Sequence, residues 1–86
     1  MAVITWKGNT GNWSDTTQWN GGVLPGINDT ASISAGVLNI NQEVNCAKIN
    51  QQGGTINTNN YAINTGYITQ KGTINAGSSY ITLDAS

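Results

Sequence analysis

The feature of this sequence that most constrains its fold is an 18-residue repeat that starts at Gly36 and continues at Gly54 and Gly72. Two residues after each of these glycines stands a branched apolar residue, and the next residue is an asparagine. The apolar residues are Leu38, Ile56 and Ile74, and the asparagines are Asn39, Asn57 and Asn75. A second apolar group lies near the middle of each unit, where apolar and polar residues mostly alternate. This alternation is typical of β-strands and shows no helical period.

Strand-like units that return at a fixed interval are the signature of a β-solenoid, in which each repeat forms one rung. Alternate side chains of such a fold point inward and stack on the same position of the next rung. We therefore predict an all-β fold, a short parallel β-helix (β-solenoid) of about three 18-residue rungs. The expected rung core consists of Leu38, Ile40, Val44, Cys46, Ile56, Ile63, Ile74, Ile81 and Leu83. The alternative is three hairpins that share a period by coincidence, and the three matching unit starts argue against it.

The glycines and asparagines of the repeat have separate expected roles. Glycine is expected at the corners of the rungs, where the chain needs a positive φ. Asn39, Asn57 and Asn75 are expected to point outward and to stack as a ladder of hydrogen-bonded amides.

The 86 residues are expected to form a single domain, residues 1–86. Residues 1–34 would hold a Trp-rich cap and the first strands, and residues 35–86 the solenoid rungs. A solenoid exposes an apolar end that must be covered. Trp6, Trp13 and Trp19 all precede the repeat, and we expect them to pack over that end, with Pro25 in a loop or at a strand edge. The competing interpretation is a carbohydrate site, in which exposed aromatic rings stack on sugars.

The same segment resembles a known family over about residues 4–34. The resemblance is carried by the spacing of Trp6, Gly8, Gly11, Trp13, Asp15, Trp19, Pro25, Gly26 and Asp29. It is similar to the opening of bacterial autotransporter-like and haemagglutinin-like β-helix proteins, short forms of which occur among tailed-phage virion proteins. The resemblance implies the start of a right-handed parallel β-helix and brings no catalytic residues with it. The chain differs from the large secreted members because its repeat covers only about three rungs.

The composition argues against several classes of partner. Charged residues make up 8% of the chain, against roughly 25% in an average globular protein. The net charge is −1 and there is no arginine, so the charge that nucleic-acid binding depends on is missing. No apolar run has the length of a membrane span, and residues 1–7 do not have the pattern of a secretory signal peptide. We expect a soluble protein made in the host cytoplasm, with no nucleic-acid or membrane partner.

The residue types also argue against catalysis. The sequence contains no histidine, the commonest general base, and its acidic residues are Asp15, Asp29, Glu43 and Asp84. Asp15 and Asp29 are expected to accept hydrogen bonds from backbone N–H groups of turns, and the alternative is a calcium site or a glycosidase-like pair. Cys46 has no histidine to activate it and is expected to be a buried packing residue. We predict no enzymatic activity, no cofactor and no metal site.

The last predicted strand points to a binding role. Its residues Tyr80, Ile81, Thr82 and Leu83 form a strand edge that invites pairing with another chain. We expect self-association there, closed by symmetry as a homotrimer. Together with the resemblance, this suggests a capsid decoration (cement) protein on the outer surface of a tailed-phage virion, bound to the major capsid protein. The alternatives are a carbohydrate-binding or adhesin-type β-helix module and a tail or fibre component.

Overall fold

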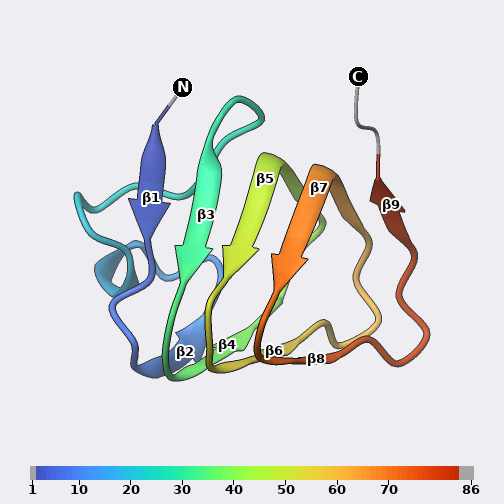
Figure 1. The fold of residues 1–86 in the computed structure, drawn as a ribbon. Coiled ribbons are helices and arrows are strands. Elements are labelled where there is room, and N and C mark those ends of the chain that lie inside the picture. The colour runs from blue at the N-terminus through green and yellow to red at the C-terminus, as the bar shows by residue number, and fades with distance from the viewer. Residues whose placement is uncertain (1, 84–86) are drawn as a thin grey trace.

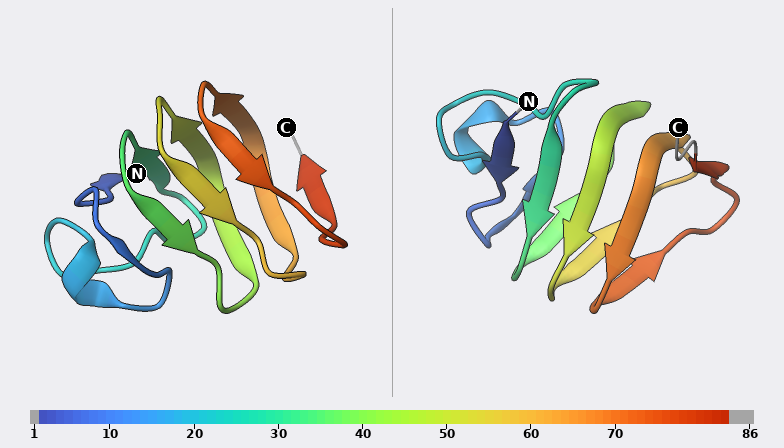
Figure 2. Two further views of the ribbon diagram at one scale, coloured as in Figure 1. Left: turned by 90° about the horizontal axis from the view of Figure 1, so that it is seen from below. Right: turned by 45° about the horizontal axis from the view of Figure 1, so that its top comes forward.

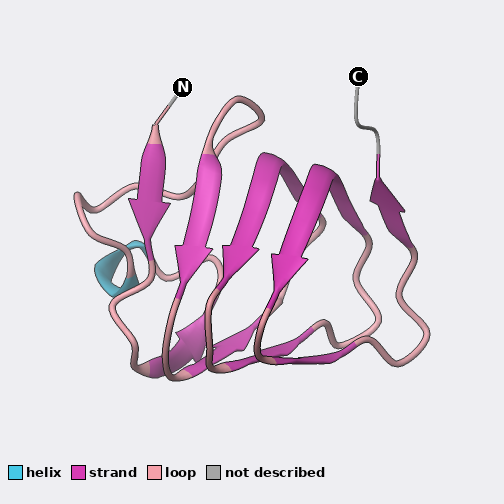
Figure 3. Cartoon of the chain, in the orientation of Figure 1, coloured by secondary structure: helices cyan, strands magenta, loops and turns pink. Residues whose placement is uncertain are grey.

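The structure, a computed structural model, describes residues 2–83. These residues form two all-parallel sheets and one short 3-10 helix, and no α-helix occurs among them (Figures 1 and 3). One sheet has the strand order β1-β3-β5-β7-β9 and the other the order β2-β4-β6-β8. The elements are β1 (Val3–Thr5), β2 (Thr10–Asn12), η1 (Thr16–Gln18), β3 (Thr30–Ile33), β4 (Val37–Asn39), β5 (Val44–Gln51), β6 (Thr55–Asn57), β7 (Ile63–Gln70), β8 (Thr73–Asn75) and β9 (Ile81–Leu83). The predicted all-β class is confirmed.

The chain alternates between the two sheets, and each return adds a strand parallel to the one before it (Figure 2). Thr30 of β3 lies opposite Lys48 of β5, 18 residues later. Leu38 of β4 lies opposite Ile56 of β6, which lies opposite Ile74 of β8. The 18-residue sequence repeat is therefore the distance along the chain between neighbouring strands of one sheet.

The interval between neighbouring strands varies where the chain makes a longer excursion. Val3 of β1 lies opposite Thr30, 27 residues later, because η1 and the loop of residues 20–29 intervene. Val44 of β5 lies opposite Ile63 of β7, 19 residues later. The sequence repeat describes only the strands from β3 onward.

The long strands β5 and β7 each contribute to two groups of pairs. β3 pairs with Lys48–Gln51 of β5, whereas β9 pairs with Ile63–Thr65 of β7. The register between β5 and β7 is interrupted at Ala47 and Gly66, between these halves, and the ribbons bend there (Figure 1). We call the set formed by Val44–Cys46, Ile63–Thr65 and β9 the short wall.

The core lies between the strands and follows their alternation. Ala31 and Ile33 of β3 are fully buried, as is Leu38 of β4. Side chains at the intervening positions, such as Ser32 and Asn39, lie at least partly in solvent. Burial of these aliphatic and indole groups is the main force that holds the sheets together.

Most of the predicted rung core is buried, with the exception of its last members. Leu38, Ile40, Val44, Cys46, Ile56 and Ile63 are buried. Ile74 and Ile81 are partly buried, and Leu83 is 57% exposed, so the prediction of a core position for Leu83 is wrong. The reason is its place in the sheet: β8 and β9 are the last strands within residues 2–83, and no further strand of that part of the chain covers them.

The repeated glycines are required for two different reasons. Gly36 and Gly54 have φ values of +83° and +76°, as expected for corners. Gly72 does not have a positive φ, so the prediction is wrong for this residue. A Cβ at position 72 would lie 2.5 Å from the carbonyl oxygen of Gly54 and 2.8 Å from Nε2 of Gln51. Gly72 is therefore set by the close approach of two corners.

One strand lies where the sequence predicts turns. Residues 7–12 are rich in glycine and asparagine, yet Thr10–Asn12 form β2. This short strand pairs with β4, and the N–H of Trp13 donates to the carbonyl of Asn39 at 2.8 Å. Pairing with a neighbouring strand outweighs the weak local preference of these residues.

Candidate functional site

The three tryptophans form one buried cluster. Trp6 and Trp13 are each 2% exposed and Trp19 is 0% exposed. The ring of Trp19 lies 5.0 Å from each of the other two in edge-to-face geometry, the arrangement that aromatic quadrupoles favour. The Nε1 of Trp6 donates to the carbonyl of Asn9, and that of Trp19 to the carbonyl of Trp13. Rings packed in this way have no free face on which a sugar can stack.

The segment around this cluster also covers the outer edge of β1. Residues 5–7 and 18–20 form an antiparallel bridge, in which the N–H of Lys7 donates to the carbonyl of Gln18 and the N–H of Asn20 to that of Thr5. Pro25 is buried in the loop of residues 20–29. The β1 end of the large sheet is thus covered.

The two carboxylates of this segment act in local turns. Oδ1 of Asp15 accepts the N–H and the hydroxyl of Thr17, at 3.0 and 2.6 Å, at the start of η1. Oδ2 of Asp29 accepts the N–H of Gly26 at 2.8 Å, and Oδ1 accepts the N–H of Ala2 at 3.0 Å. These bonds, that of Gly26 first, lower the pKa of Asp29. Within residues 2–83 no three acidic, histidine or cysteine side chains gather as metal ligands would.

Cys46 is a buried thiol in the short wall. Its side chain is 4% exposed, and its Sγ lies 3.7 Å from Oγ1 of Thr65. Desolvation raises the pKa of the thiol above its ordinary value, against the smaller opposing effect of Thr65. A protonated and enclosed sulfur is a packing group and a poor nucleophile.

Amide side chains form hydrogen-bonded ladders across both sheets. Nδ2 of Asn57 donates to Oδ1 of Asn39 at 3.0 Å, and Nδ2 of Asn75 donates to Oδ1 of Asn57 at 2.7 Å. On the short wall, Nδ2 of Asn64 donates to Oδ1 of Asn45 at 3.2 Å. The expected ladder of residues 39, 57 and 75 is present, and the second ladder was not expected because its members are 19 residues apart.

The predicted self-association edge lies on β9. Tyr80 is 82% exposed and Leu83 57% exposed, Thr82 is exposed, and Ile81 is half-buried. β9 pairs with β7, and no described residue pairs with its other edge. Tyr80 itself precedes the strand, whereas the other three residues form it.

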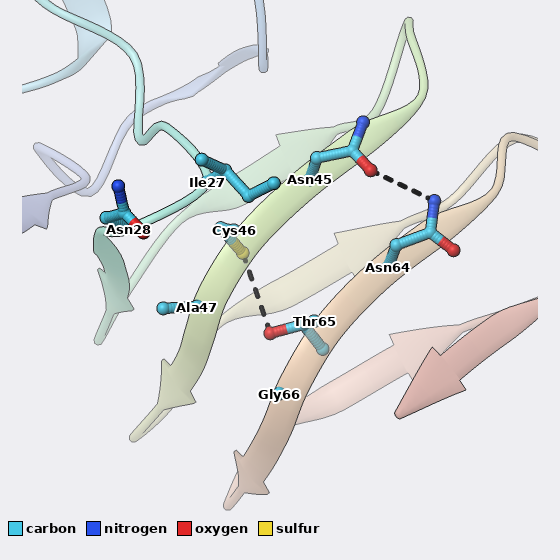
Figure 4. Close-up of a pocket in the computed structure, with 8 residues that line it drawn as sticks. All are labelled: Ile27, Asn28, Asn45, Cys46, Ala47, Asn64, Thr65 and Gly66. Carbon is cyan, nitrogen blue, oxygen red and sulfur yellow. Dashed lines mark hydrogen bonds between the residues drawn. The ribbon is translucent and has the colours of Figure 1, made fainter. Parts of the chain in front are cut away.

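A hollow of about 420 Å³ lies at the opposite edge of the short wall. It extends from the loop of residues 20–29 across β5 to β7 (Figure 4). Its lining includes Ile27, Asn28, Asn45, Cys46, Asn64 and Thr65. Ile27 is 71% exposed and lies beside β5. Sequence reasoning missed this hollow.

Sequence reasoning also missed Gln51, which is fully buried at the corner between β5 and β6. Its Nε2 donates to the carbonyls of Gly54 and Thr73, which belong to successive corners. Its Oε1 has no hydrogen-bond partner among the described residues. The one signal in the sequence is a glutamine at the end of an otherwise apolar strand.

Comparison of the chain with family models, curated proteins and solved structures gave no match. No helix formed by residues 2–83 is long and apolar enough to cross a membrane. The argument for function therefore depends on the surfaces described above.

Proposed function

We propose that the two sheets are walls of a short parallel β-solenoid, and that this solenoid is a capsid decoration protein of a tailed phage. In this proposal it binds the major capsid protein on the outer surface of the virion as a homotrimer and has no enzymatic activity. It stabilises the shell by bridging neighbouring capsomers.

The solenoid is supported by the way neighbouring strands repeat. The chain alternates between the sheets at each step, and equivalent residues such as Leu38, Ile56 and Ile74 lie side by side at an interval of 18 residues. The amides of Asn39, Asn57 and Asn75 are bonded in the same order. Stacked repeats of this kind make a rigid body, because each repeat is fixed by its neighbours.

The observation that carries the proposal is the difference between the two ends of this body. The end at β1 is covered by the tryptophan cluster and by an antiparallel bridge. The end at β9 presents the exposed side chains of Tyr80 and Leu83 beside a strand edge that no described residue pairs with. An edge of this kind is a template for association with another chain.

Decoration is the role that best uses a rigid body without catalytic groups. A protein that binds two neighbouring capsomers of an assembled shell, and not the separated subunits, stabilises the assembly by its binding free energy. The surface has few charges, so binding of this kind depends on shape and hydrogen bonds.

The two alternatives have less support. A carbohydrate-binding module would need the tryptophans at the surface, and they are buried. A tail or fibre component uses the same surfaces at another place on the particle, so localisation on purified virions separates it from a head protein.

The test compares purified virions with and without this protein. Virions that lack it are expected to release their DNA at a lower temperature and under a milder osmotic shock, and addition of the purified chain is expected to restore resistance. Equal resistance of both particles, with the protein located on complete heads, would contradict the proposal.

A further inference from the structure

The hollow beside β5 exists because one repeat of the short wall is replaced by a turn. Thr30 lies opposite Lys48, and the same 18-residue interval would place residues 26–28 opposite residues 44–46. Instead, the N–H of Asp29 donates to the carbonyl of Gly26, and a carboxylate oxygen of Asp29 accepts the N–H of Gly26. This turn directs the chain away from β5 and leaves the hollow in place of a strand.

The backbone of β5 has an unpaired position on this side. The N–H of Val44 donates to Ala62 on the side of β7, and the N–H of Ala47 donates to Asp29 on the opposite side. Successive backbone groups of a parallel strand point alternately to its two neighbours. The N–H and carbonyl of Asn45 therefore face the hollow, where the turn provides no strand to pair with them.

The short wall thus has two free edges of opposite kind. One is the edge of Val44–Cys46 at the hollow, and the other is the outer edge of β9. In a parallel sheet the last edge of one sheet continues the first edge of another without a change in hydrogen-bond pattern. Exposed apolar side chains stand at both edges, Ile27 at the hollow and Leu83 on β9.

We infer that β9 of one copy adds to β5 of a second copy, in the hollow beside Ile27, and that this contact builds the oligomer. The inference rests on the proposed decoration function and names the surfaces of its trimer. The incoming strand has three residues, the length of the β5 segment left unpaired. No charged side chain lines the hollow, and β9 carries none, so no unpaired charge is buried.

The geometry of this contact favours a ring. Each copy gives one edge and receives the other, a head-to-tail contact that either closes into a ring or continues as a fibre. The tryptophan cluster and η1 lie at the same end of the molecule as the hollow. They obstruct a second copy placed in line with the first, so successive copies must be tilted, as a closed trimer requires.

The experiment uses the purified chain and two matched pairs of variants, measured by light scattering on a size-exclusion column. Ile27→Asp places a charge at the hollow, and its control Val23→Asp changes a residue of the same loop that is 51% exposed and does not line the hollow. Leu83→Asp places a charge on β9, and its control Val3→Asp changes a 68% exposed residue of β1. All four side chains are exposed, and circular dichroism checks that each variant is folded.

The decisive step is to mix the two interface variants. Each alone is expected to have the mass of one chain, 9.0 kDa, while the wild type and both controls have three times that mass. Ile27→Asp keeps an intact β9 and Leu83→Asp keeps an intact hollow, so their mixture is expected to form a two-chain species that cannot grow further.

Three results would overturn the inference. They are a wild type that stays monomeric, a control variant that dissociates as far as its partner, and a mixture that stays monomeric at the highest concentration. None of these outcomes depends on virions. Loss of the ring with an intact effect on virion stability therefore rejects this contact alone, and the converse rejects decoration alone.

Discussion

At the scale of single residues, glycine is needed at position 72 for space and at position 21 for conformation. A Cβ on Gly72 would lie 2.5 Å from a backbone oxygen, whereas Gly21 has φ +86° and open space around it. Gly72→Ala is expected to lower the free energy of unfolding by about 1–3 kcal/mol, as overpacking does. Gly72→Asn is expected to be at least as damaging. Gly21→Asn is expected to remain within about 0.5 kcal/mol of the wild type, because asparagine tolerates this conformation. Urea denaturation measures all three, and similar losses for the two asparagine variants would refute the distinction.

Asp29 makes the stability of the fold depend on pH in acid. The N–H groups of Gly26 and Ala2 bond its carboxylate and lower its pKa below the ordinary value of 3.8. A carboxyl whose pKa is lower in the folded state contributes stability above its unfolded pKa and loses it as the pH falls through the folded pKa. The thermal midpoint of the wild type is expected to fall as the pH is lowered below 3.8. Asp29→Asn is expected to be less stable at pH 7 and to lose less between pH 4 and pH 2, measured by thermal denaturation. An unchanged acid dependence in the variant would show that Asp29 is not responsible.

At the scale of elements, the amide ladder ties β4, β6 and β8 together. Asn57 is its middle member, with one bond to Asn39 and one to Asn75. Asn57→Ala is expected to lower the free energy of unfolding by about 1–3 kcal/mol, the net value of two hydrogen bonds. Asn12 lies opposite Asn39 on β2, and no side-chain bond between them is present, so Asn12→Ala is the control and should cost less than about 0.5 kcal/mol. Equal losses in chemical denaturation would mean that the ladder adds nothing beyond strand pairing.

The tryptophan cluster gives a spectroscopic test of its own burial. Because Trp6, Trp13 and Trp19 are enclosed, native emission is expected at short wavelength and should shift to the red on denaturation. Neutral oligosaccharides added to the native protein are expected to leave both the wavelength and the intensity unchanged. A saturable change with sugar would instead place at least one ring at the surface and favour the carbohydrate alternative.

The sequence predicts these elements unequally, for physical reasons. The repeat from Gly36 onward determines the register, because side chains stacked on one another must be similar in character, as Leu38, Ile56 and Ile74 are. The hollow could not be predicted in this way. The 18-residue interval implies a strand at residues 26–28, and a turn stabilised by Asp29 replaces it. Whether backbone bonds or a side-chain bond wins at such a place depends on the neighbours in space.

At the scale of the whole molecule, the account describes a small rigid body with one covered end and two complementary strand edges. The extents of the described chain are 28 × 27 × 22 Å, so a large part of its surface lies near an edge. The same lack of charge that allows repeats to stack also allows copies to approach one another. Association between copies then extends the contact that already joins strand to strand within the chain.

The measurement that tests this account most directly is the absolute mass of the wild-type chain in solution, by light scattering over a wide range of concentrations. The account predicts a trimer, three times the 9.0 kDa of one chain, whose mass does not depend on concentration once it has formed. A mass of one chain at every concentration would contradict it, because both edges of the short wall would then remain unpaired in a stable protein.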